Sequence, residues 1–132
     1  MGFIYVDVVV RGLESVETIR MLVDTGSTYI ILDPKIIKRL KLLSTPYTVE
    51  LTLADKRRVK ARLFRAEVEV QGRKGPAFIA EVDTPTPLLG VYALETLGFK
   101  VDPTTGRLES IAPEGGYLLY CLDSEPLQLS LK

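Results

Sequence analysis

Alternation of apolar and polar side chains is the feature that most limits what this 132-residue chain can fold into. Apolar residues recur at every second position in five stretches: 4–10, 19–23, 47–53, 59–63 and 66–70. Successive side chains of a β-strand point to opposite faces, so this period of two predicts strands that each bury one face. Many short strands at close spacing predict an all-β domain, either a barrel or a sandwich.

Turn-forming sequences separate the strands, and two short helices interrupt them. The turns are "RGLES", "QGRKGP" and "DTPTP". The first helix is expected in "LDPKIIKRL", with Asp33 as N-cap and Pro34 at the first helical position. The second is expected in "GVYALETLG" and ends at Gly98. Residues 99–111 then read as two strands joined by a turn that contains proline and glycine.

Composition removes several classes of function. Lys+Arg and Asp+Glu number 17 each, so the net charge of zero gives no reason to expect a nucleic-acid partner. The chain has no histidine, which excludes His-ligated zinc and His-based nucleophile pairs, and we expect no metal site. No segment has the length of a membrane span, so no membrane partner is expected. The single cysteine, Cys121, fits a reducing compartment, and we expect a cytoplasmic protein.

The run "MLVDTGSTYIIL", residues 21–32, places a carboxylate and a glycine inside an apolar stretch. Gly26 can adopt backbone angles that other residues avoid, so the chain can turn sharply and present Asp24 at the end of a strand. The hydroxyls of Thr25 and Ser27 can orient that carboxylate. The plain alternative is a structural turn aspartate. An unpaired carboxylate beside buried strands is costly, however, which favours a functional one.

A single carboxylate is a poor hydrolase, whereas two carboxylates held close share one proton and act as an acid and a base. The sequence offers no second D-[ST]-G. Asp83 is followed two positions later by Pro85, and Asp123 by Glu125, so neither can make the glycine turn. The second carboxylate would therefore be Asp24 of another copy, related by a two-fold axis.

"LVDTGSTYIIL" followed by "PLLGVYALETLG" resembles the two signature blocks of the retropepsin-like aspartic proteases, the single-domain, homodimeric relatives of pepsin. In that family the first block carries the catalytic loop, and the second is a strand that passes beneath the loop and enters a helix. The resemblance covers residues 3–111. It implies a closed, barrel-like all-β protease domain over 1–111, followed by a C-terminal segment at 112–132.

The resemblance also assigns roles to individual residues. Asp24 would be the catalytic carboxylate, Thr25 would hydrogen-bond across the dimer, Gly26 would admit the substrate backbone, and Ser27 would donate to the outer oxygen of Asp24. The hairpin "YTVELTLADKRRVKARLF" takes the place of the flap that closes over substrate, although its charged tip has no glycine. The expected substrate contacts are Ala54, Asp55, Lys56, Leu89 and Gly90.

Together these features predict a homodimeric aspartic endopeptidase that hydrolyses a polypeptide substrate with water activated between two Asp24 side chains, without a cofactor. The alternative is a peptide-binding or dimerisation module of the same fold that does not turn over substrate. The apolar, strand-like stretch 117–131 follows the hinge-like "APEGG". We expect it either to pair with its two-fold mate or to fold back on its own barrel as an extra edge.

Overall fold

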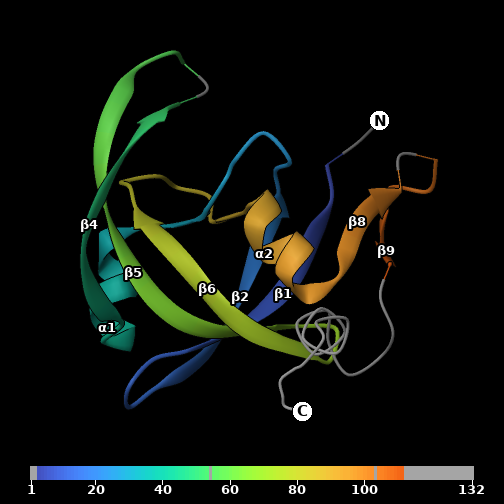
Figure 1. Ribbon diagram of the computed structural model, residues 1–132, viewed down its shortest axis with the longest axis horizontal. Helices are drawn as coiled ribbons and strands as arrows, with labels where there is room; N and C mark the ends of the chain where they lie inside the picture. The colour runs from blue at the N-terminus through green and yellow to red at the C-terminus, as the bar shows by residue number, and fades with distance from the viewer. Residues whose placement is uncertain (1–2, 54, 103, 112–132) are drawn as a thin grey trace, which may run out of the picture.

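The computed structural model describes residues 3–53, 55–102 and 104–111, and strands make up most of this part of the chain (Figure 1). The elements, in chain order, are β1 (Tyr5–Arg11), β2 (Val16–Val23), β3 (Ile30–Leu32), α1 (Pro34–Leu40), β4 (Leu43–Thr52), β5 (Arg58–Val70), β6 (Arg73–Glu81), β7 (Leu88–Leu89), α2 (Val91–Leu97), β8 (Phe99–Asp102) and β9 (Arg107–Ser110). Among the described residues, no helix is long and apolar enough to cross a membrane.

The main sheet closes into a ring. Its strand order is β1-β2-β7-β3-β6-β5-β4, and β1 also pairs with β5, with Val10 opposite Val68. The hydrogen-bonded circuit therefore runs from β1 through β5 and back to β1, while β4 is attached to β5 outside it (Figure 1). The expectation of an all-β fold with one or two short helices is confirmed, and the closed, barrel-like sheet that was expected is observed as this ring.

The alternating apolar residues fill the inside of the ring. Large side chains from six of the strands have no exposed surface: Val8, Val10, Met21, Leu32, Val70, Ile79 and Leu89. Both helices add buried residues to this core, Ile37 and Leu40 from α1 and Ala93, Leu94 and Leu97 from α2. Burial of this apolar area is the main favourable term that holds the ring together.

The caps predicted for both helices are present. The Asp33 carboxylate accepts a hydrogen bond from the Lys35 N–H at 2.7 Å, and Pro34 begins α1. Gly98 ends α2 with φ of 82°, a left-handed conformation that suits glycine, and its N–H donates to the Glu95 carbonyl. These local signals fix the start of α1 and the end of α2.

The turn expected at "QGRKGP" is shorter than predicted. Only Gln71 and Gly72 form it, with φ of 50° and 84°, and β6 already begins at Arg73. Pro76 is tolerated inside β6 because β3 pairs with that strand only from Ile79 onward, so no neighbour on that edge needs its missing N–H. The stretches 59–63 and 66–70 are likewise one continuous strand, β5, and not two.

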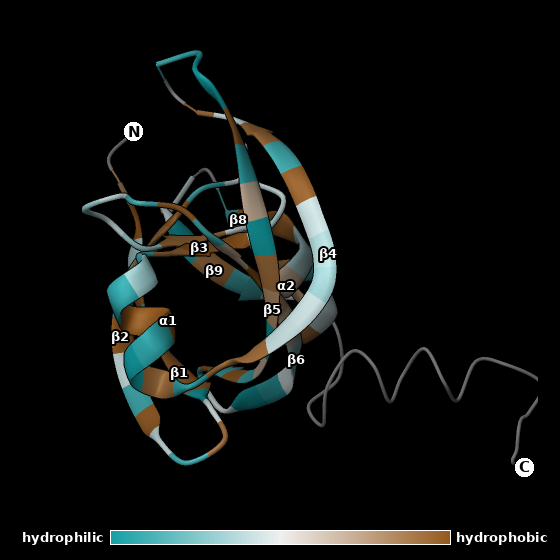
Figure 2. Cartoon of the chain, turned by 90° about the vertical axis from the view of Figure 1, so that its left-hand side faces the viewer, coloured by the Kyte–Doolittle hydropathy of each residue, from teal (hydrophilic) through white to brown (hydrophobic). Residues whose placement is uncertain are grey.

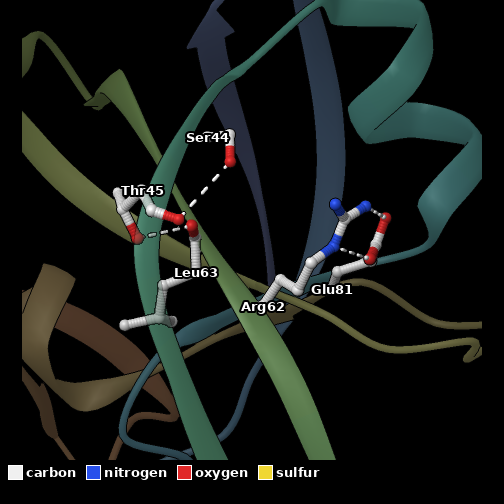
Figure 3. A network of polar contacts seen from close by, with 5 residues as sticks. All are labelled: Ser44, Thr45, Arg62, Leu63 and Glu81. Carbon is white, nitrogen blue, oxygen red and sulfur yellow. Dashed lines mark hydrogen bonds and ion pairs between the residues drawn. The ribbon is translucent and has the colours of Figure 1, made fainter.

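The β4–β5 hairpin leaves the ring at a shoulder (Figure 3). There the register of β4 on β5 shifts between Ser44 and Thr48. The Thr45 hydroxyl donates to the Leu63 carbonyl at 2.8 Å. Arg62 forms an ion pair with Glu81 of β6 at 3.2 Å. Arg62 directly precedes Leu63, where the pairing of β5 with β6 begins. The hairpin beyond this shoulder pairs only within itself among the described strands.

The last described strands, β8 and β9, form a separate hairpin. It ends beside α2, where the Ile111 N–H donates to the Gly98 carbonyl at 2.8 Å. The expected dimer strands of the segment 112–132 lie outside the described residues, so that expectation stays a prediction.

Candidate active site

β7 holds the loop that carries Asp24. This two-residue strand lies between β2 and β3, parallel to the first, with Val23 opposite Leu89, and antiparallel to the second, with Ile31 opposite Leu88. The Asp24 N–H donates to the Leu89 carbonyl at 3.0 Å, so pairing continues into the loop. The strand expected beneath the Asp-Thr-Gly loop is therefore present, and it anchors both strands that the loop connects.

The loop also orients the Asp24 side chain from within. One carboxylate oxygen, Oδ1, accepts the Gly26 N–H at 2.9 Å, and the Asp24 carbonyl accepts the Ser27 N–H at 3.0 Å. Asp24 is half-buried, whereas Thr25 and Gly26 are exposed. Within the described part of the chain Asp24 has no ion pair. The carboxylate is thus fixed in direction at the rim of the molecule, with its second oxygen left for another partner.

Ser27 does not do what the resemblance implies. Its hydroxyl donates to the Tyr29 carbonyl at 2.8 Å. A serine hydroxyl has one hydrogen, so the same group cannot also donate to the outer oxygen of Asp24. In this structure Ser27 therefore stabilises the far side of the loop in place of the expected contact with Asp24.

The two glycines of the site differ from what the sequence suggests. Gly26 does not have a positive φ, and a Cβ at this position would contact only Asp24 Oδ1, at 3.3 Å. The absence of a side chain at Gly26 leaves space beside the Asp24 carboxylate. A Cβ on Gly90 would lie 2.4 Å from the Tyr29 carbonyl oxygen and 2.7 Å from that of Ser27. Only glycine permits this close packing of backbone on backbone.

The start of α2 supports the same loop. The Val91 N–H donates to the Ser27 carbonyl at 2.8 Å, and the Tyr92 N–H donates to the Thr28 carbonyl at 3.1 Å. The rings of Tyr29 and Tyr92 meet edge to face with their centroids 5.7 Å apart. The first N–H groups of a helix have no partner inside it, so here the loop satisfies them.

Leu89 and Gly90 lie behind this loop and not at its surface. Leu89 is fully buried, and Gly90 is buried beneath residues 27–29. Both residues are buried in this structure, and the expected direct contact with substrate stays a prediction. Their role is to hold the loop that presents Asp24.

The tip of the β4–β5 hairpin is a compact charged turn, and Figure 2 shows it as hydrophilic. The Leu53 N–H donates to the Arg57 carbonyl, and the Lys56 N–H donates to the Leu53 carbonyl, both at 2.8 Å. Asp55 accepts the Arg57 N–H at 3.0 Å and pairs with its Nε at 2.7 Å. These contacts, the backbone one foremost, lower the pKa of Asp55. Asp55 and Lys56 are exposed, as expected of a tip, and Ala54 lies outside the described residues.

An apolar wall connects the hairpin with the Asp24 loop. This hairpin wall is a cluster separate from the ring core, with buried Ile31, Ala61, Leu63, Ala80 and Val82 and half-buried Tyr29, Val49, Leu51, Leu53, Val59 and Leu88. Its members come from β3, β4, β5, β6, β7 and the loop ends. Alternation in 47–53 and 59–63 already indicated the hairpin's apolar face. That this face continues to Tyr29 and Leu88 could be learned only from the strand order.

The comparison with known families agrees with this geometry. The family model of the aspartyl proteases matches residues 6–93, more than half of the chain. The match takes in the Asp24 loop, the β4–β5 hairpin, β7 and the start of α2. No curated protein matches the chain closely enough to be compared with it. With the loop, the strand beneath it and the family match in agreement, the chain belongs to the retropepsin-like aspartic proteases.

Proposed function

We propose that the protein is a homodimeric aspartic endopeptidase whose catalytic pair is Asp24 from each of two chains. The observation that carries this proposal is the state of Asp24. Its direction is fixed by the Gly26 N–H, it is half-buried, and it has no ion pair with any described residue of its own chain. A second copy placed across a two-fold axis would complete the site without any second motif.

The chemistry needs both carboxylates. The ionised Asp24 takes a proton from the attacking water while the protonated one gives its proton to the carbonyl oxygen of the substrate. The new C–O bond forms a tetrahedral intermediate. The C–N bond then breaks as the leaving amine receives a proton from the pair. Thr25 is exposed at the loop tip and its hydroxyl has no hydrogen-bond partner within the described residues, which supports a role in contact with the opposite loop.

The hairpin wall indicates the kind of substrate. Tyr29 and Leu88 lie at the loop end of the wall, and Leu53 lies near the hairpin tip, each half-buried. An extended peptide held between wall and loop would place apolar side chains on this surface, where their burial favours binding. The protease would therefore prefer apolar residues beside the scissile bond.

Asp24→Asn is the decisive variant. An asparagine pair cannot take up and release the shared proton, so cleavage of an unfolded protein should fall by about a thousandfold or more. The fold should remain, because the amide oxygen can still accept the Gly26 N–H. Asp7→Asn is the control, since Asp7 is an exposed carboxylate on β1. An Asp24→Asn protein that keeps a tenth of the activity would exclude the mechanism.

Mixing tests whether two chains share the site. When wild-type and Asp24→Asn chains exchange in equal amounts, half of all dimers are mixed and inactive, so activity should fall to about half of that shown by the wild-type chains alone. Mixing with Asp7→Asn chains should leave the activity additive. Additive activity with Asp24→Asn would mean that one chain suffices.

The charged tip favours one alternative function. Its turn is closed by the Asp55–Arg57 pair and has no glycine among the described residues 53 and 55–58, which suits a fixed wall better than a moving cover. A peptide-binding module of the same fold would bind apolar peptides without cleaving them. It would be distinguished by peptide binding that Asp24→Asn leaves intact together with no cleavage by the wild-type protein.

A further inference from the structure

A second apolar hollow lies away from the Asp24 loop, between β6 and α2. This β6–α2 groove has a volume of about 720 Å³, and Ala77, Phe78, Tyr92, Ala93, Thr96 and Ile111 line it. No residue of 24–27 lines it, so it is distinct from the candidate active site. A hollow of this size can hold several side chains.

Three large apolar side chains of the groove are exposed. Phe78 is 43% exposed, Tyr92 55% and Ile111 50%. They belong to different elements yet line the same hollow, so their exposed surfaces are contiguous and not scattered. Contiguous apolar surface of this kind marks a place where another segment or molecule binds.

We propose that residues 117–122 of the same chain, with the sequence "YLLYCL", bind in the β6–α2 groove. The chain already enters the groove at Ile111, whose N–H is held by the Gly98 carbonyl at 2.8 Å. The linker "APEGG" follows at once and contains two glycines. It allows Tyr117 to lie anywhere within about 20 Å of Ile111, which is enough to turn back along the groove.

The chemistry of the segment matches that of the groove. Residues 117–122 carry no charge, and five of the six are leucine or tyrosine, which suits the exposed rings of Phe78 and Tyr92. Asp123 and Glu125 follow directly. Arg65 also lines the groove and has no ion pair within the described residues, so it offers these carboxylates a partner of opposite charge. Glu95 is the other charged residue that lines the groove.

Binding there would reach the Asp24 loop through α2. Tyr92 lines the groove, and its ring contacts Tyr29 while its N–H holds the Thr28 carbonyl. A segment packed on Tyr92 would restrict the first turn of α2 and, with it, the far side of the loop. The C-terminal segment would thus act as a brace on the site without forming part of it.

Cys121 is the only cysteine of the chain and lies inside the proposed segment, so its reactivity reports on binding. In the full chain, a small maleimide should label Cys121 at least tenfold more slowly than it labels a free peptide of residues 112–132. Phe78→Asp should raise the rate toward that of the peptide. Tyr47→Asp is the control, because Tyr47 is 63% exposed on β4 and does not line the groove. A wild-type rate equal to that of the peptide would overturn the proposal.

Cross-linking decides which chain supplies the segment. Single variants Phe78→Cys and Tyr92→Cys place a second thiol on either wall of the groove, and mild oxidation with diamide should join one of them to Cys121 within a single chain. The product should run as a monomer on a non-reducing gel, and Tyr47→Cys should give no such product. A covalent dimer would mean that a second copy fills the groove, and no disulfide from either variant would mean that residues 117–122 bind elsewhere. Both results would overturn the proposal.

Discussion

The Asp24 loop and the hairpin tip are both short turns between strands, but they are held in different ways. The loop is tied to other elements: β7 accepts its first N–H, and α2 donates to the carbonyls of Ser27 and Thr28. The described hydrogen bonds of the tip join residues 53–57 only to one another. The loop is therefore set by the whole fold, whereas the tip is set by its own few residues and can change without disturbing the ring.

The largest difference between the two turns is expected from a substitution at Gly90. Its missing Cβ lets the backbone of residues 27–29 pack on it, with the Tyr29 oxygen only 2.4 Å from where that atom would lie. Gly90→Ala forces these backbones apart, and we expect it to lower the free energy of unfolding by about 3 kcal/mol and to abolish cleavage. Urea denaturation followed by circular dichroism measures the first effect.

Gly26→Ala is the matched control in the same loop. Its Cβ would touch only Asp24 Oδ1, at 3.3 Å, so the free energy of unfolding should change by less than about 1 kcal/mol. Equal destabilisation by the two variants would contradict the assignment of Gly90 as the glycine on which the loop packs.

A substitution of Ser27 is expected to have an intermediate effect on stability. Its hydroxyl donates to the half-buried Tyr29 carbonyl, so Ser27→Ala should cost about 1 kcal/mol of unfolding free energy. Because the hydroxyl does not donate to Asp24, the pH at which cleavage is fastest should stay where it is. Ser44→Ala is the control, since the Ser44 hydroxyl makes only a 3.4 Å contact at the exposed shoulder (Figure 3). A shifted pH optimum in Ser27→Ala would restore the contact that the family resemblance implies.

The smallest effect is expected at the tip. The Arg57 N–H and guanidinium lower the pKa of Asp55 in the folded protein. A lowered pKa means that the carboxylate stabilises the turn at pH values above its unfolded pKa of about 3.9, and that this contribution is lost as the pH falls through the folded value. Hydrogen-exchange protection of the Arg57 amide should therefore drop in acid, while global stability stays almost unchanged because Asp55 is exposed.

Asp55→Asn removes the titrating group and should make that protection independent of pH over the same range. Persistence of the acid-dependent loss in Asp55→Asn would assign it to another group.

Local signals in the sequence predicted the parts of the fold that depend on local interactions. Asp33 and Pro34 predicted the start of α1, and Gly98 predicted the end of α2, because caps act within one turn. Strand β6 (Arg73–Glu81) was not among the predicted strands, because "QGRKGP" was interpreted as a turn and Pro76 normally ends a strand; only the edge that β6 leaves unpaired before Ile79 explains how Pro76 fits there. The closing of the ring between β1 and β5 joins residues far apart in sequence and leaves no local sign.

The candidate site shows the same division. Asp24 could be found from its motif, and β7 only from the family resemblance, since a two-residue strand has no periodicity of its own. The sequence assigned conformational freedom to Gly26, whereas the structure requires the absence of a side chain at Gly90. Which glycine is indispensable depends on the distance between two backbones, and no pattern in one chain reports that distance.

The single length of β5 has a mechanical consequence. From Arg58 to Arg62 the strand has β4 as its partner, and from Leu63 it is also bonded to β6 and then to β1. One end of β5 is therefore held in the ring, while the other end projects from it with β4 as its partner, like a beam fixed at one end (Figure 1). Any approach of the free end to the Asp24 loop would bend this beam at the clamp, where the register of β4 shifts and Arg62 pairs with Glu81. The stiffness of the β4–β5 hairpin would then be set at this point, and not by the charged residues at its tip.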